Sequence, residues 1–213
     1  MMNNILEYLD SLFPEPKCEL NYNRDYELLI AIVLSAQTTD KRVNKVTEVL
    51  FNEYSSLLEL SEANVSDIEN IIREIGTFRR KSVYVIEIAK RLVNDGYFYV
   101  PNNREYIESL PGVGRKTTNV FLSNIYNEAA IAVDTHVSRV SKRLGLVSKN
   151  DDVAKIEKKL EKKIPREKWG KVHHQLVLFG RYYCKAVKPE CANCKLKDIC
   201  KYNKNRWFMS SIL

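Results

Sequence analysis

The stretch LPGVGRKTTNV, residues 110–120, places two glycines two positions apart, with a proline before them and two cations behind. A dinucleotide-binding loop needs a third glycine three positions after the second, and a strand before the first. Here position 117 is threonine, and REYIESL before the stretch has helical periodicity. A Walker phosphate loop needs four residues between its glycines and a lysine directly after the second. The stretch fits neither nucleotide-binding pattern.

A tight turn between two helices remains as the interpretation of this stretch. Pro111 ends the first helix, while Gly112 and Gly114 allow positive φ and let backbone amides approach a ligand closely. The free amides and the positive end of the second helix suit a phosphate group. We therefore expect this turn to bind an anion.

The second helix divides into an apolar and a polar stripe. The expected core stripe is Val113, Thr117, Val120, Phe121 and Ile125, and the polar stripe is Lys116, Asn119 and Ser123. Lys116 falls in the first turn, where the positive helix end favours the neutral amine that a nucleophile needs. Most surface lysines only improve solubility, so the pattern alone leaves both interpretations of Lys116 open.

Four of the five cysteines, Cys184, Cys191, Cys194 and Cys200, lie close together near the end of the chain. In a chain without a secretion signal, such a group indicates a metal centre rather than disulfides. One Cys-x-x-Cys pair flanked by single cysteines suits an iron–sulfur cube better than a zinc ribbon, which has two separated pairs. The spacing favours iron–sulfur and keeps zinc as the alternative. The many lysines around these cysteines would balance the negative charge of a cluster or face phosphates.

The composition is that of an ordinary globular chain. It has 213 residues, 45% apolar and 29% charged, enough for one domain or two small ones. The net charge of +7 favours a polyanionic partner, although it also fits a solubilising surface. We expect no signal peptide and no transmembrane segment, because no apolar run approaches membrane-spanning length. The expected location is the cytoplasm, associated with DNA.

Helical periodicity covers most of the chain. Ser66 and Glu69 have the spacing of a capping box, Asp134 could begin a helix that ends at Gly145, and Asp151 or Asp152 could begin the next. Only residues 97–100 and 130–133 look strand-like, and both are too short to make a sheet. The sequence therefore predicts an all-α fold of about ten helices.

Three motifs in order, LPGVGRKTTNV, VDTHVSRV (133–140) and the cysteine spacing, resemble the endonuclease III family of DNA glycosylases with lyase activity. The resemblance extends from about Ile5 to Tyr202. It implies two packed helical subdomains with a cleft between them. One, over 18–128, is a six-helix domain with a helix-hairpin-helix at about 104–127. The other is an iron–sulfur domain formed by 1–17 and 129–213, whose four cysteines bind one [4Fe-4S] cluster.

The resemblance also implies the chemistry: a monomer that acts in base-excision repair on duplex DNA with an oxidised pyrimidine or an abasic site. The family's catalytic lysine and aspartate match Lys116 and Asp134. The lysine amine attacks C1′ of the sugar and displaces the base, and the resulting Schiff base lets the 3′ phosphate leave by β-elimination. Asp134 would stabilise positive charge on the sugar or move the lysine's protons, and could cap its helix as well.

Further residues are matched to DNA contacts by the same resemblance. Gln37 matches the glutamine that fills the space left by the flipped base, and His136 is given a supporting polar contact. The hairpin residues implied to bind DNA are Leu110, Gly112, Val113, Gly114 and Arg115. Two positions depart from the family: Thr77, before Phe78, stands where a leucine wedge is common, and Thr118 stands where the hairpin usually has alanine.

Two alternatives to a bifunctional glycosylase/lyase remain. A non-catalytic DNA-binding module would keep the hairpin and the cluster but would need neither Lys116 nor Asp134. A relative that acts on mismatched adenine lacks the lysine and adds a C-terminal recognition domain. Because thirteen residues follow Cys200, we expect no such domain.

Overall fold

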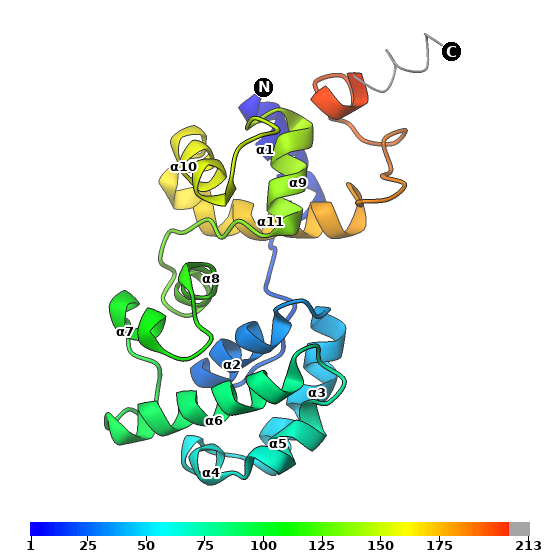
Figure 1. Ribbon diagram of the computed structural model, residues 1–213. Coiled ribbons are helices and arrows are strands. Elements are labelled where there is room, and N and C mark those ends of the chain that lie inside the picture. Colours follow the sequence, from blue (N-terminus) through cyan, green and yellow to red (C-terminus); the bar gives the residue numbers. More distant parts are fainter. Residues whose placement is uncertain (205–213) are drawn as a thin grey trace. The chain divides into compact units, whose positions relative to one another are not determined.

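The structure, a computed structural model, describes residues 1–204, and Figure 1 shows the helices along the chain. In that range the chain forms α-helices and one 3₁₀ turn and contains no strand, so the all-α prediction is confirmed. The two strand-like stretches, 97–100 and 130–133, are irregular segments between helices. None of the described helices combines the length and apolar character needed to cross a membrane.

The chain divides into two compact units, each with its own hydrophobic core. The first contains Cys18–Tyr126, and the second combines Met1–Lys17 with the described part of Asn127–Leu213. The N-terminal helix α1 (Met2–Leu12) therefore shares a core with the C-terminal helices and packs against α11 (Trp169–Tyr182).

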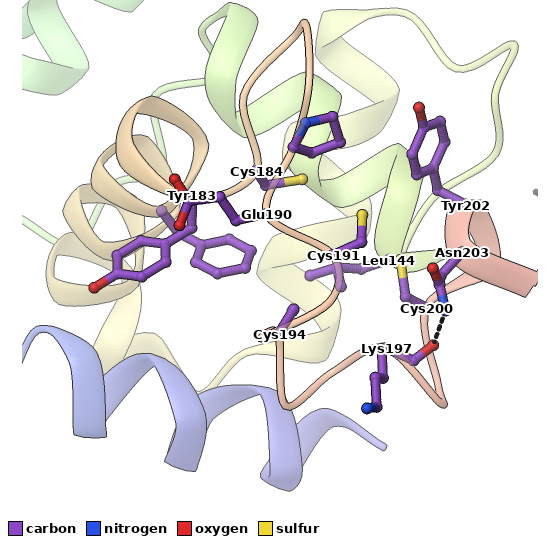
Figure 2. Close-up of a pocket in the computed structure, with 12 residues that line it drawn as sticks. Leu144, Tyr183, Cys184, Glu190, Cys191, Cys194, Lys197, Cys200, Tyr202 and Asn203 are labelled. Carbon is purple, nitrogen blue, oxygen red and sulfur yellow. Dashed lines mark hydrogen bonds between the residues drawn. The ribbon is translucent and has the colours of Figure 1, made fainter.

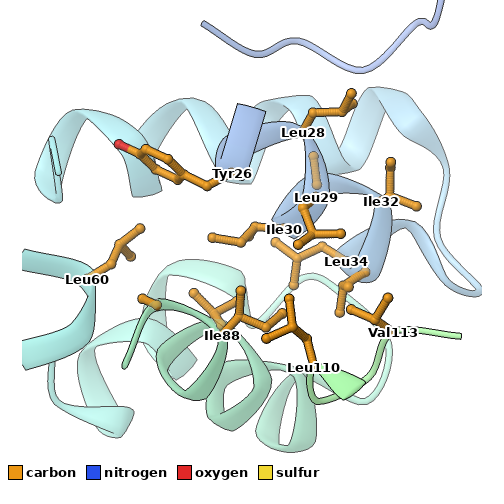
Figure 3. Packing of buried hydrophobic residues seen from close by; sticks show 14 of the residues in the cluster. Tyr26, Leu28, Leu29, Ile30, Ile32, Leu34, Leu60, Ile88, Leu110 and Val113 are labelled. Carbon is orange, nitrogen blue, oxygen red and sulfur yellow. The ribbon is translucent and has the colours of Figure 1, made fainter. Parts of the chain in front are cut away.

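The unit Cys18–Tyr126 is built around α2 (Asp25–Ser35), which is buried on all its faces from Tyr26 to Leu34. An apolar helix of this kind must lie at the centre of a domain. It packs against α3, α6 and α8, and Figure 3 shows its apolar side chains together with Ile88 of α6. The other helices of this unit are α3 (Asp40–Glu53), α4 (Leu57–Glu62), α5 (Val65–Ile72), α6 (Phe78–Asn94), α7 (Arg104–Ser109) and α8 (Arg115–Ile125).

The other unit contains α9 (Thr135–Leu144), α10 (Val153–Lys163) and the 3₁₀ turn Arg166–Lys168 besides α1 and α11. Helices α9 and α11 approach each other closely at Gly180. A Cβ at that position would lie 2.9 Å from Cβ of His136, so a larger residue would force the helices apart. An isolated glycine inside a helical pattern is the one sequence signal of this contact.

The helix starts and ends test the predicted caps. Asp134 and Asp152 each accept a first-turn amide, and Gly145 ends α9 with a φ of 78°, as predicted. The Ser66 capping box is wrong. Helix α5 already begins at Val65, with the extended Asn64 as its N-cap, so Ser66 is a helical residue and cannot cap.

Candidate functional site

The turn between α7 and α8 is anchored by two apolar side chains. Leu110 and Val113 are 2% and 8% exposed and belong to the core of their unit, next to α2 (Figure 3). The amide of Val113 donates to the carbonyl of Leu110 at 3.1 Å, which closes the turn. Any contact of these two residues with a ligand therefore uses the backbone. Gly112, Gly114 and Arg115 are exposed.

The two glycines of the turn differ in backbone conformation and in the space around them. Gly112 has a φ of +75°, and a Cβ there would lie 2.4 Å from Cδ2 of Tyr84 on α6. Gly114 is the extended N-cap of α8, and a Cβ there would meet nothing within 4 Å. Because glycine has no capping side chain, the first-turn amides of α8 keep their capacity to bind an anion. Sequence reasoning found the glycines and missed Tyr84.

Lys116 is exposed in the first turn of α8, as expected. The predicted stripes of this helix are partly wrong, because Thr118 and Asn119 are buried beside Phe121. Oδ1 of Asn119 accepts a hydrogen bond from Nη1 of Arg104 at 2.8 Å, so an amide assigned to the polar face is held inside the hairpin. The hydroxyl of Thr118 donates to the carbonyl of Gly114 at 3.2 Å, which makes its burial possible.

Asp134 is the N-cap of α9, in the second unit. Its Oδ1 accepts the amide hydrogen of Val137 at 2.7 Å. The buried segment Ile131–Val133 precedes it, so both sides of the carboxylate are fixed. The carboxylate therefore lies at the N-terminal end of the helix, next to its first-turn amides. Asp134 thus presents a half-exposed, oriented negative charge.

His136 belongs to a hydrogen-bond network inside the same unit. Its Nδ1 lies 3.1 Å from Nη2 of Arg139, which also donates to the carbonyl of Gly180 at 2.7 Å. Nε of Arg139 donates to the carbonyl of Cys184 at 3.1 Å. The guanidinium therefore connects α9, α11 and the start of the cysteine segment, and it places His136 within that network.

Gln37 is exposed on the turn that follows α2 and has a φ of 59°. Thr77, at the start of α6, is also exposed and has a φ of 58°. Phe78 is half-buried and packs against the core of its unit. Of Thr77 and Phe78, Thr77 is the exposed residue, and it stands at the position where the family often has a leucine wedge.

The four clustered cysteines line one pocket in the second unit, and Figure 2 shows them around it. All are free thiols. Burial raises the pKa of the Cys184 and Cys194 thiols, so binding a metal there would release protons. Among the described residues, no three His, Cys, Asp or Glu side chains are close enough together to hold a metal ion. The four cysteines nevertheless line the same pocket, and four thiols are the donor type that an iron–sulfur cluster uses. Cys18 packs against the other core.

Arg143 holds the first part of this cysteine segment. Its Nη1 donates to the carbonyl of Lys185 at 2.6 Å and lies 3.4 Å from Sγ of Cys184, and its Nη2 donates to the carbonyl of Ala186 at 3.1 Å. The guanidinium also stacks over the ring of Tyr202 at 4.3 Å. Neither Arg139 nor Arg143 was predicted as a site residue, although their spacing of four puts them on one face of α9.

Comparison with known proteins shows which family this chain resembles. Residues 30–166 match the model of the HhH-GPD superfamily base excision DNA repair protein. Endonuclease III of Bacillus subtilis (strain 168) is 42% identical over 201 residues, which cover 94% of this chain and 92% of that protein. A solved non-covalent Endonuclease III–DNA complex superposes with a TM-score of 0.93 at 43% identity. A trapped Endonuclease III–DNA covalent intermediate does so with a TM-score of 0.92 at the same identity. Both alignments cover 97% of each chain.

Proposed function

This chain belongs to the endonuclease III family of the HhH-GPD superfamily, and we propose that it excises oxidised pyrimidines from duplex DNA as a monomer. As a member of this family it is a base-excision DNA glycosylase and abasic-site lyase. The proposal concerns the lesion, the residues that act on it and the cluster.

The position of Lys116 carries the proposal. The lysine is exposed in the first turn of α8, directly after a glycine N-cap that leaves the helix amides available for a phosphate. A purely binding module has no need of a lysine matched to the family nucleophile at this place. One short element thus supports both a grip on the DNA backbone and the attacking amine.

The proposed reaction first releases the base and then cuts the strand. The amine of Lys116 forms a bond to C1′, and the glycosidic C–N bond breaks with its electron pair leaving on the base, which takes up a proton. The nitrogen lone pair then forms the C1′=N bond of a protonated Schiff base while the C1′–O4′ bond breaks, and O4′ takes up a proton from water. Loss of a proton from C2′ then expels the 3′ phosphate with the electrons of its C–O bond. The capped carboxylate of Asp134 stabilises the positive charge that develops on the sugar.

The remaining matched residues are assigned to holding DNA. We propose that the amides of the hairpin turn bind the backbone of a DNA strand and that Arg115 binds a phosphate. His136 makes a supporting polar contact. Gln37 occupies the space of the flipped base and offers its amide to the unpaired partner base.

We assign one [4Fe-4S] cluster to Cys184, Cys191, Cys194 and Cys200. When bound, such a cluster holds a loop together by four thiolate bonds and adds local negative charge. Arg143 and Arg139 hold the chain at Cys184 from α9 through carbonyl hydrogen bonds.

Borohydride trapping tests this function. The panel consists of duplexes with an oxidised pyrimidine, an abasic site, a mismatched adenine or no damage. The wild-type chain and Lys149→Gln, a change at another exposed lysine, should form a covalent adduct with the first two substrates. Lys116→Gln should form none while it still binds DNA. Absence of any wild-type adduct would favour the non-catalytic module, and adenine excision would point to the mismatch-specific alternative.

A further inference from the structure

Two exposed turns of the unit Cys18–Tyr126 have unusual backbone conformations and lie next to each other. Gln37 and Thr77 both adopt left-handed φ values, 59° and 58°. Such values are strained for residues with a side chain and persist only where the surroundings enforce them. A Cβ on Gly76 would lie 3.9 Å from the carbonyl oxygen of Gln37, so the two turns are in contact.

The side chain of Lys81, on α6, reaches the base of both turns. It is only 4% exposed. Its Nζ donates to the carbonyl of Leu34 at 2.9 Å and to that of Ala36 at 2.6 Å. Its own amide donates to the carbonyl of Thr77 at 3.1 Å. One residue therefore joins the end of α2, which leads into Gln37, to the first turn of α6, which begins at Thr77.

The chemistry of this contact explains why a lysine is buried there. The last carbonyls of α2 have no partner within the helix and form its negative end, which favours a cation. Burial lowers the pKa of Lys81, a sign that the ammonium is largely removed from water. An apolar side chain of similar length would avoid that cost but would leave two carbonyls without a donor.

We infer that Lys81 is a positioning residue that fixes the Gln37 turn against the Gly76–Thr77 turn, so that both tips meet the DNA as one preformed element. The inference rests on the proposed function, in which Gln37 enters the space of the flipped base. With Lys81 in place, the ordering of Gln37 is completed during folding. Without it, this ordering has to occur during binding and weakens recognition of a flipped or missing base.

A double-mutant cycle tests this role. The variants are Lys81→Met, Gln37→Ala and the combination, and the control is Lys90→Met, an exposed lysine of the same helix. Affinity is measured for an abasic duplex whose site is an uncleavable tetrahydrofuran sugar and for undamaged duplex, at one salt concentration. We expect Lys81→Met to weaken binding of the abasic duplex about tenfold, to leave undamaged duplex unchanged, and to add almost nothing to Gln37→Ala.

Two measurements separate this role from general destabilisation. Fluorescence of 2-aminopurine opposite the abasic site reports insertion of Gln37 and should lose its change in Lys81→Met but not in Lys90→Met. If Lys81→Met does not fold, Lys81→Gln, which keeps an amide donor, replaces it in the cycle. Additive effects, or equal losses on abasic and undamaged duplex, would overturn the inference. Borohydride trapping by the wild-type chain checks the proposed function separately.

Discussion

A methyl group placed on Gly112 would lie 2.4 Å from Cδ2 of Tyr84 and 2.9 Å from its Cε2. Side-chain carbons do not approach one another this closely, so the ring of Tyr84 and the hairpin turn are in full contact. The turn is therefore shaped by α6 as well as by its own sequence. Its backbone groups are held in a fixed place for a ligand, because the ring supports them from inside the unit.

Gly112→Ala should destabilise the protein more than Gly114→Ala, which loses only the N-cap preference for glycine over alanine. Alanine at 112 must adopt a φ of +75° and displace the Tyr84 ring, and the two effects together should lower the free energy of unfolding by about 2–4 kcal/mol. Alanine at 114 meets no atom within 4 Å. Chemical denaturation of both variants measures the difference.

Tyr84→Ala provides the control for this comparison. It removes the ring that a new Cβ would strike, so Gly112→Ala should cost less in the Tyr84→Ala background, with only the φ strain left. Equal costs in both backgrounds would show that the contact with Tyr84 does not restrict position 112.

Some helix caps, although not that of α5, could be predicted from the sequence, because a cap depends on a few consecutive residues. Asp134 and Asp152 are examples. The burial of Asn119 could not be predicted, since its amide oxygen accepts from Arg104, fifteen residues earlier on α7. Lys81 directly follows two arginines, a run that usually indicates a solvated face, and only the end of α2 gives its charge a reason to be buried.

For the site residues too, local features could be predicted from the sequence, whereas contacts between distant residues could not. The motif around Lys116 predicts an exposed lysine at a helix start, and the structure has one. The contacts that fix the hairpin turn, the Gln37 turn and the cysteine segment come from Tyr84, Lys81 and Arg143 respectively, and each is distant in sequence from the groups it holds. No local pattern reports such contacts, because they depend on how helices pack.

Asp10→Asn should make the protein less stable at neutral pH, and this difference should shrink in acid. The hydrogen bond from Lys171, followed by that from Gln175, lowers the pKa of Asp10. Its folded-state pKa is thus below the ordinary value of about 3.9, so its contribution is complete above that value and is lost as pH falls through the folded pKa. Asparagine at position 10 still accepts a hydrogen bond from Gln175, so the comparison isolates the ion pair with Lys171.

Unfolding free energies of wild type and Asp10→Asn at pH 7 and at decreasing pH measure this effect. Because the pair is about 40% exposed on both sides, its size should not exceed about 1 kcal/mol. Lys171→Met is the matched variant and should remove the same contribution. A difference that stays constant as pH falls through the pKa of Asp10 would assign the effect to packing of α1.

Arg143→Lys should weaken retention of the proposed cluster. Lysine keeps the charge but cannot reproduce the planar fork that reaches the carbonyls of Lys185 and Ala186 together. Wild type should contain about four irons per chain. The variant should lose iron and visible absorbance faster when a chelator is added. Lys142→Met, the neighbouring change on α9, is the control, and equal iron loss in all three proteins would exclude this role of Arg143.

Asp134→Asn and Asp134→Ala should separate the capping role of this residue from its chemical role. Asparagine caps a helix as well as aspartate does, so Asp134→Asn should keep nearly wild-type stability, whereas Asp134→Ala should lose about 0.5–2 kcal/mol. Neither variant has a carboxylate to stabilise charge on the sugar, so single-turnover base excision should fall strongly in both. Thermal unfolding and excision rates, measured on the same preparations, give the two values. If Asp134→Asn excised bases at the wild-type rate, the carboxylate would serve only as a cap, and the charge on the sugar would have to be stabilised by another group.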